Sequence, residues 1–129
     1  MPVFKQLSVF LENKPGALAR LCESFTEQKI NIIAMCVSDT VDHAVIRLIV
    51  SDPAKALLIL EQYGVLVVEN EVLGLRMADK PGVLMQIANK LGKIKVNIEY
   101  GYGTAGSGKN SLMILRVSNT EKARKALKA

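Results

Sequence analysis

The chain of 129 residues contains no tryptophan and few other aromatic side chains, three Tyr and three Phe. Proteins that bind single-stranded nucleic acid stack its bases on aromatic rings, and this sequence offers little for such a platform. It also has a single histidine, His43, and two cysteines, Cys22 and Cys36, which form no C-x-x-C pair. We therefore expect no metal site and no cofactor, and the sequence contains no recognisable catalytic set.

Long apolar runs are absent as well, and none approaches the roughly 20 residues that a membrane-crossing helix needs. The opening "MPVFKQLSVF" alternates polar and apolar residues and lacks the apolar core of a signal peptide. We expect a cytoplasmic protein with no membrane partner.

The positive charge is concentrated in the second half of the chain. Residues 1–70 contain six Lys/Arg and eight Asp/Glu, whereas residues 71–129 contain eleven and four. A basic half of this kind can bind nucleic acid, but several of the cations fall in the last predicted helix, where they also suit a solvated face. We expect no nucleic-acid partner and keep an RNA-binding domain as an alternative.

A glycine-rich segment near the end, Gly103 to Lys109, fits the phosphate-loop template G-x-x-x-x-G-K. The template continues with Ser or Thr and then a helix, but here Asn110 follows, and the next run, "SLMILRV", indicates a strand. The glycines therefore favour a hairpin between two strands, with ATP binding as the alternative.

The most informative feature is an internal repeat. "NKPGALARLCESFTEQKINI" from Asn13 and "DKPGVLMQIANKLGKIKVNI" from Asp79 align without a gap at an offset of 66 positions. One extra residue later in the chain then brings "SDPAKA" at Ser51 onto "SNTEKA" at Ser118. The sequence thus holds two copies of one structural unit.

Each copy predicts the same order of elements. In the first copy we expect a strand at 5–12, a helix capped by Asn13 with Pro15 in its first turn, strands at 30–38 and 43–51, a helix at 51–64 and a strand at 65–71. The second gives a strand at 72–78, a helix at 81–93, strands at 96–102 and 110–118, and a helix at 119–128, with no clear final strand. The predicted fold class is α+β, with two ferredoxin-like βαββαβ units in domains 1–70 and 71–129.

The turn between the first strand and first helix of each copy has the chemistry of a ligand site. The peptide N–H groups of Gly16, Ala17 and Leu18 belong to the unpaired set at a helix start, and the helix dipole there favours an anion such as a carboxylate. Asn13 adds an amide that donates and accepts, and Gly16 leaves the backbone uncovered. A plain capped turn explains the same residues, so both interpretations stand at this point.

Asn31 and Asn97 interrupt apolar strands at equivalent positions of the two copies. Asn is a poor strand former, and a buried Asn without partners costs roughly 1–3 kcal/mol. Each amide therefore either lies in water at an edge or bonds a ligand across an interface.

The stretch "LENKPGALARLCESFTEQKINIIAMCVS" resembles the opening of an ACT domain. The N-x-P-G-x-L turn, followed by a strand that contains N-I, is the signature of that family of small-molecule-sensing modules. The second copy carries it as D-x-P-G-x-L, and the resemblance extends over nearly the whole chain as a tandem pair. The chain is most similar to stand-alone tandem ACT proteins, which have no attached enzyme.

The resemblance implies an amino-acid site between the turn of one ACT domain and a strand of a neighbouring one. Transferred by position, the ligand-binding residues are Asn13, Pro15, Gly16, Ala17, Leu18, Asn31 and Ile32 in the first copy and Asp79, Pro81, Gly82, Val83, Leu84, Asn97 and Ile98 in the second. ACT domains join their sheets side by side, and the missing final strand leaves an edge for a second chain to cover. We expect a homodimer that binds a free amino acid.

The leading hypothesis is therefore a non-enzymatic, allosteric amino-acid sensor. The alternative is a regulatory subunit of a separate amino-acid biosynthetic enzyme such as acetolactate synthase, which would be its partner.

Overall fold

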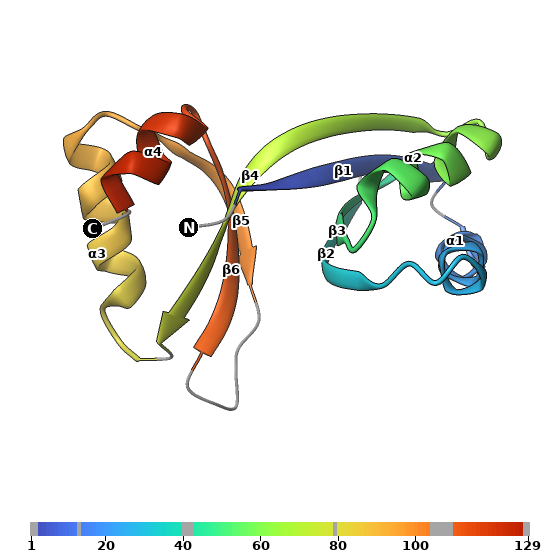
Figure 1. Ribbon diagram of the computed structural model, residues 1–129, viewed down its shortest axis with the longest axis horizontal. Coiled ribbons are helices and arrows are strands. Elements are labelled where there is room, and N and C mark those ends of the chain that lie inside the picture. Colours follow the sequence, from blue (N-terminus) through green and yellow to red (C-terminus); the bar gives the residue numbers. More distant parts are fainter. Residues whose placement is uncertain (1–2, 13, 40–42, 79, 104–109, 128–129) are drawn as a thin grey trace. The chain divides into compact units, whose positions relative to one another are not determined.

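The computed structural model describes residues 3–12, 14–39, 43–78, 80–103 and 110–127 and forms two compact units (Figure 1). The N-terminal unit is Lys5–Asn70, and the C-terminal unit is Glu71–Ala129 together with Met1–Phe4. The domain limits expected from the sequence, 1–70 and 71–129, stay a prediction.

The elements follow the predicted α+β order. They are β1 (Val3–Glu12), α1 (Ala17–Glu27), β2 (Ile32–Asp39), β3 (His43–Val50), α2 (Pro53–Gln62), β4 (Leu66–Ala78), α3 (Val83–Lys93), β5 (Ile98–Gly103), β6 (Asn110–Val117) and α4 (Thr120–Leu127). Two tandem ferredoxin-like units are confirmed.

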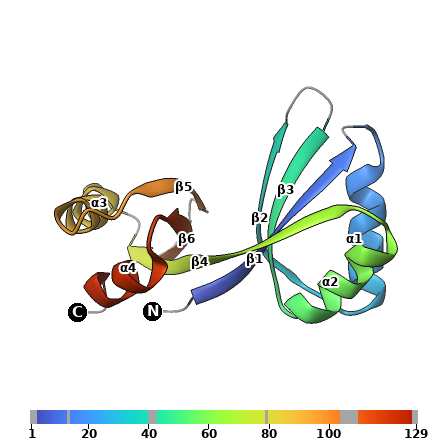
Figure 2. The ribbon, with the colours of Figure 1, turned by 90° about the horizontal axis from the view of Figure 1, so that it is seen from above.

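The N-terminal unit packs two helices on one face of its strands (Figure 2). Its strand order is β2-β3-β1-β4, with β3 antiparallel to both β1 and β2. The alternation of β1 turns Leu7, Val9 and Leu11 toward the helices, where they meet Leu21 and Phe25 of α1 in the core. The apolar stripe of α1 is what fixes the helix against the sheet.

The C-terminal unit has the same construction. β6 lies between β4 and β5 and pairs antiparallel with both. Its core contains Leu73 and Leu75 of β4, Leu115 of β6, Leu91 of α3 and Ala123 of α4. The hairpin interpretation of the glycine-rich segment is supported on both sides, because β5 ends at Gly103 and β6 begins at Asn110.

One correction concerns the strands predicted at 65–71 and 72–78. They form a single uninterrupted strand, β4, of 13 residues. The stretch "VENE" at 68–71 contains no Gly or Pro to turn the chain, so nothing in it ends the strand. The last strand of one repeat is thus continuous with the first strand of the next.

A second correction concerns the edge that the sequence leaves open in the second copy. β1 neighbours β4 on the side away from β6, and the opening of β1, through Phe4, belongs to the C-terminal unit. The ring of Phe4 lies so close to Gly74 that a Cβ built there would be 2.1 Å from the ring carbon Cε2. The chain's own first strand therefore supplies the neighbour that we expected from a second chain.

Both first helices end in the same way. Lys29 and Lys95 adopt left-handed φ values of 58° and 61°. The next residues close the motif, because Ile30 N–H donates to the Phe25 carbonyl at 2.8 Å and Val96 N–H donates to the Leu91 carbonyl at 2.9 Å. This is a Schellman ending in which a lysine occupies the position that glycine prefers.

The contact of Phe4 with Gly74 predicts that Gly74→Ala lowers the free energy of unfolding by about 1–3 kcal/mol, because the new methyl group must displace the ring. Urea denaturation measures this loss. In a Phe4→Ala background the same substitution should cost far less. Gly92→Ala is the matched control: it lies in α3 with no atom within 4 Å of the added Cβ, so it should be neutral or stabilising by about 0.5–1 kcal/mol. Equal losses at both glycines would contradict the proposed contact.

The left-handed lysines predict a stabilising substitution. Lys95→Gly should raise the free energy of unfolding by about 0.5–1 kcal/mol, because glycine adopts the positive φ without strain. Lys90→Gly, within α3, is the matched control and should lower stability by a similar amount. Thermal and urea denaturation should therefore show changes in the free energy of unfolding of opposite sign for the two variants. A lower free energy of unfolding in both would refute the proposed backbone strain at Lys95.

Candidate functional site

The turn that precedes α1 is built around a left-handed glycine. Gly16 is the residue that caps the helix, with φ 86° and ψ −13°, and it makes no side-chain cap hydrogen bond. Gly82 repeats this before α3 with φ 93° and ψ −14°. The prediction that Asn13 caps the helix and that Pro15 lies in its first turn is wrong. Gly16, with its positive φ, is the N-cap, and the helix begins at Ala17. Asn13 and Asp79 themselves lie outside the described residues.

The positive φ also changes how Gly16 and Gly82 are interpreted. A Cβ at Gly82 would meet nothing within 4 Å, and one at Gly16 would meet only Arg20 Nη1, at 4.0 Å. The backbone conformation alone is therefore enough to require glycine at both positions. Glycine is not by itself an indication of a ligand here.

The start of α1 does present free donors. Ala17 N–H donates to the Lys14 carbonyl at 3.4 Å, and the first intrahelical bond runs from Arg20 N–H to the Gly16 carbonyl at 3.1 Å. Among the described residues, the N–H groups of Leu18 and Ala19 have no acceptor. Ala17 and Leu18 are half-buried and pack against the core, so the predicted turn presents mainly its backbone.

The turn of the second copy is similar. Pro81, Gly82 and Leu84 are exposed and Val83 is half-buried. Lys80 N–H donates to the Ala78 carbonyl at 3.0 Å, as Lys14 N–H does to the Glu12 carbonyl. The two turns therefore share this hydrogen bond and the left-handed glycine.

Asn31 and Asn97 immediately precede β2 and β5, and both are exposed. Ser51 holds the backbone of Asn31 on both sides: Asn31 N–H donates to Ser51 Oγ and Ser51 N–H donates to the Asn31 carbonyl, each at 2.9 Å. Ser118 does the same for Asn97, with both distances again 2.9 Å. Ser51 and Ser118 align in the repeat, but nothing in the sequence indicated that each would hold the backbone of an asparagine. The cap of α2 is Asp52, which accepts from Lys55 N–H at 3.1 Å.

The turn and the asparagine of one unit do not come together. α1 separates Gly16 from Asn31, and its 11 residues extend about 16 Å. Ile32 and Ile98, which follow the asparagines, are half-buried and pack into the cores of their units. A ligand that contacts both a turn and an asparagine therefore needs parts of two different domains.

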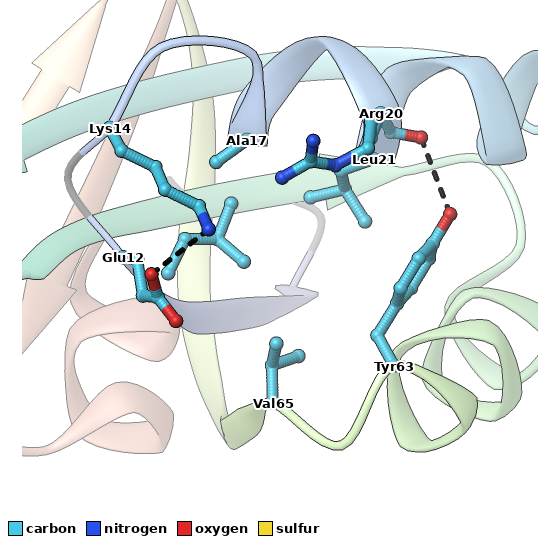
Figure 3. Close-up of a pocket in the computed structure, with 8 residues that line it drawn as sticks. Glu12, Lys14, Ala17, Arg20, Leu21, Tyr63 and Val65 are labelled. Carbon is cyan, nitrogen blue, oxygen red and sulfur yellow. Dashed lines mark hydrogen bonds and ion pairs between the residues drawn. The ribbon is translucent and has the colours of Figure 1, made fainter.

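A pocket of about 150 Å³ lies beside the first turn, inside the N-terminal unit (Figure 3). It is lined by residues of β1, the turn, α1 and the segment after α2: Leu11, Glu12, Lys14, Ala17, Arg20, Leu21, Tyr63 and Val65. Of these, Ala17 alone was a candidate ligand-binding residue in the sequence. Tyr63 is 43 positions from Arg20, and no local pattern connects them.

Charges gather at this pocket. Lys14 Nζ and a Glu12 carboxylate oxygen form an ion pair at 3.1 Å. Tyr63 donates its hydroxyl proton to the Arg20 carbonyl at 3.4 Å and also contacts the Ser24 hydroxyl. The Arg20 guanidinium points toward the start of α1 (Figure 3) and has no hydrogen-bond or ion-pair partner among the described residues.

Other chemistries find less support. A phosphate loop needs a helix after its lysine, whereas the segment continues into β6; residues 104–109 themselves lie outside the described part of the chain. On α4, Arg124 hydrogen-bonds Glu121 and thereby lowers the pKa of that carboxyl, so part of the basic helix is internally paired. Within the described ranges, no group of three or more His, Cys, Asp and Glu side chains could hold a metal ion. In the same residues, no helix has the length and apolar character to cross a membrane.

Comparison with solved structures finds a protein of Bacteroides thetaiotaomicron with 36% sequence identity and a TM-score of 0.91, covering 98% of this chain and 87% of that one. The regulatory subunit of aspartate kinase from Thermus thermophilus, in its ligand-free form, is 15% identical with a TM-score of 0.71, covering 99% and 96%. The corresponding subunit from Thermus flavus is 14% identical with a TM-score of 0.61, covering 98% and 90%. At these identities the two kinase subunits show a shared fold alone.

Comparison with curated proteins gives no match. The family model described as an ACT domain pair matches residues 1–128, nearly the entire sequence. The chain belongs to the family of ACT domain pairs.

Proposed function

We propose that this chain is a non-enzymatic sensor that binds a free amino acid at interfaces between ACT domains. ACT domains are regulatory modules rather than catalytic ones, and membership of the family supports a regulatory, ligand-binding role. The proposed ligand contacts are the residues of the two turns and the two strand starts, including Asn13 and Asp79.

The observation that carries the proposal is the exposed amide at Asn31 and Asn97. Each serine holds only the backbone of its asparagine, and any residue could supply that backbone. Both side chains are exposed, so the folded core does not require an amide at either position. Both asparagines lie just before a strand rather than within one as predicted, so strand propensity does not explain them, and an amide that stands at the same place in both copies favours a role in binding.

The two kinds of element offer complementary groups for a zwitterion. The free N–H groups at a helix start and the positive end of the helix dipole suit the carboxylate. The amide oxygen of an asparagine suits the ammonium group. Because the two elements are far apart in one unit, such a ligand would join neighbouring domains and stabilise their assembly by its differential affinity.

The proposal includes a homodimer. Its support is no longer the open edge of the second copy, where β1 lies, but the exposed apolar face of β2. β2 is an edge strand of the N-terminal unit, and Ile33, Met35 and Val37 along one of its faces are 42%, 39% and 50% exposed. An exposed apolar face on an edge strand is a typical site for contact with another chain. Sedimentation analysis measures the state: a monomer at micromolar concentration, with or without ligand, would remove the dimer from the proposal.

The same apolar edge favours the second candidate, a regulatory subunit of an amino-acid biosynthetic enzyme. In that case β2 would contact the enzyme, and the amino-acid site would form only in the complex. Co-purification from native extract separates this candidate from the free-standing sensor.

The sensor proposal predicts a thermal shift with one or two of the twenty amino acids. A ligand at 100 times its dissociation constant should add about 2.7 kcal/mol to the free energy of unfolding. Asn31→Ala and Asn97→Ala should each reduce the shift, and the double variant should abolish it, while the unliganded melting temperature stays nearly unchanged because both side chains are exposed.

Asn89→Ala is the matched control, since Asn89 is an exposed amide on α3, away from both strand starts. It should leave the ligand shift intact. A full shift in the double variant would refute the proposed site. Glycine variants are poor probes here, because Gly16 and Gly82 need their positive φ for folding.

A further inference from the structure

The pocket beside the first turn has a charged side and an apolar side. Its apolar walls come from Leu11 of β1, Ala17 and Leu21 of α1, and Val65 after α2. Its volume of about 150 Å³ suits a small molecule. Apolar walls of this kind favour a ligand with a short hydrocarbon body.

The charges beside the pocket do not cancel. Glu12 and Lys14 neutralise each other in their ion pair, which leaves the Arg20 guanidinium as a positive charge with no ion-pair partner among the residues that the structure describes. A guanidinium fork binds a carboxylate through two parallel hydrogen bonds. The start of α1, which lines the pocket at Ala17, adds the positive end of its dipole.

The backbone around Arg20 is held in place. Its carbonyl accepts from the Tyr63 hydroxyl at 3.4 Å and from Ser24 Oγ at 3.3 Å, and these side chains tie α1 to the end of α2. The Tyr63 ring also lines the pocket, from the side opposite the turn (Figure 3). The guanidinium is thus the part of Arg20 that stays available to a ligand.

We propose that this pocket binds a small carboxylate with a short apolar body, its carboxylate on Arg20 and its hydrocarbon part against Leu11, Leu21 and Val65. The site lies within one unit and uses neither Asn31 nor Asn97. It shares Ala17, at the start of α1, with the proposed interface site, but it needs no second domain and so does not depend on the proposed function.

The second copy does not repeat these groups. At the offset of 66, Gln86 stands in place of Arg20, Ala78 in place of Glu12, and Val83 in place of Ala17. The turns and asparagines are shared by the copies, but this charge pattern belongs to the N-terminal unit. Gln and Val are therefore residues that the equivalent helix of the second copy accommodates at the positions of Arg20 and Ala17, which makes them suitable substitutions for a test.

The test is a titration of the isotopically labelled full chain with isovalerate, followed by NMR of the backbone amides. We expect saturable shifts at Ala17, Leu21 and Val65 and none with methyl isovalerate, which has a similar body and no charge. A parallel titration with leucine tests whether Glu12 binds an ammonium group. If leucine binds more tightly than isovalerate, Glu12 binds the ammonium group of the ligand. If leucine binds equally or more weakly, the pocket recognises the carboxylate and the hydrocarbon body alone. Equal binding of inorganic phosphate at the same amides, or no saturable shift with either carboxylate, would overturn the proposal.

Arg20→Gln should weaken isovalerate binding roughly ten- to a hundredfold, the usual effect of losing hydrogen bonds to a charged group. Arg76→Gln, at an exposed arginine of β4, is the charge-matched control and should bind normally. Ala17→Val should weaken binding by filling the pocket while keeping Arg20. Normal binding by Arg20→Gln would refute the assignment, and retained binding by the Asn31→Ala, Asn97→Ala double variant separates this site from the interface site.

Discussion

The constraint on which the rest of the structure depends is the continuity of β4. One strand of 13 residues closes the first βαββαβ unit and opens the second, so no turn or linker separates the repeats. The unit that begins on β4 therefore needs a neighbour on its other side, and the opening of β1 lies there, with Phe4 over Gly74. A glycine in the middle of a strand is otherwise unfavourable, and here the aromatic ring explains it.

The sequence was sufficient to predict the repeat, the order of the elements and the core faces, because these depend on local period and composition. Leu7, Val9 and Leu11 face the helices as their alternation requires. It was not sufficient where a single backbone angle decides the outcome. The cap of α1 was assigned to Asn13 from side-chain chemistry, whereas the positive φ of Gly16 sets the start of the helix.

Long-range neighbours were also beyond prediction. No local signal in the sequence indicates that Phe4 contacts Gly74. Because this contact could not be predicted, we expected a second chain to cover the edge of the second copy. The sequence likewise predicts Arg20 only as an exposed helix residue. Its position beside a pocket follows from the packing of α1 near Tyr63, which the sequence does not show. The charge differences between the copies, Arg20 against Gln86 and Glu12 against Ala78, were signals in the sequence that could have led to the pocket.

The two proposed sites differ in what they can regulate. A ligand that joins a turn to the asparagine of another domain changes assembly directly, because its contacts exist only when the domains meet. A carboxylate on Arg20 has no such contact, but the guanidinium lies next to Gly16, within 4.0 Å of where its Cβ would be. Charge brought to Arg20 would then oppose a second carboxylate at the neighbouring helix start. Such a coupling is reciprocal, so each ligand would weaken the other by the same factor. A single amino acid could in that case bind one site or the other of the N-terminal unit, but fill both only at a cost in affinity.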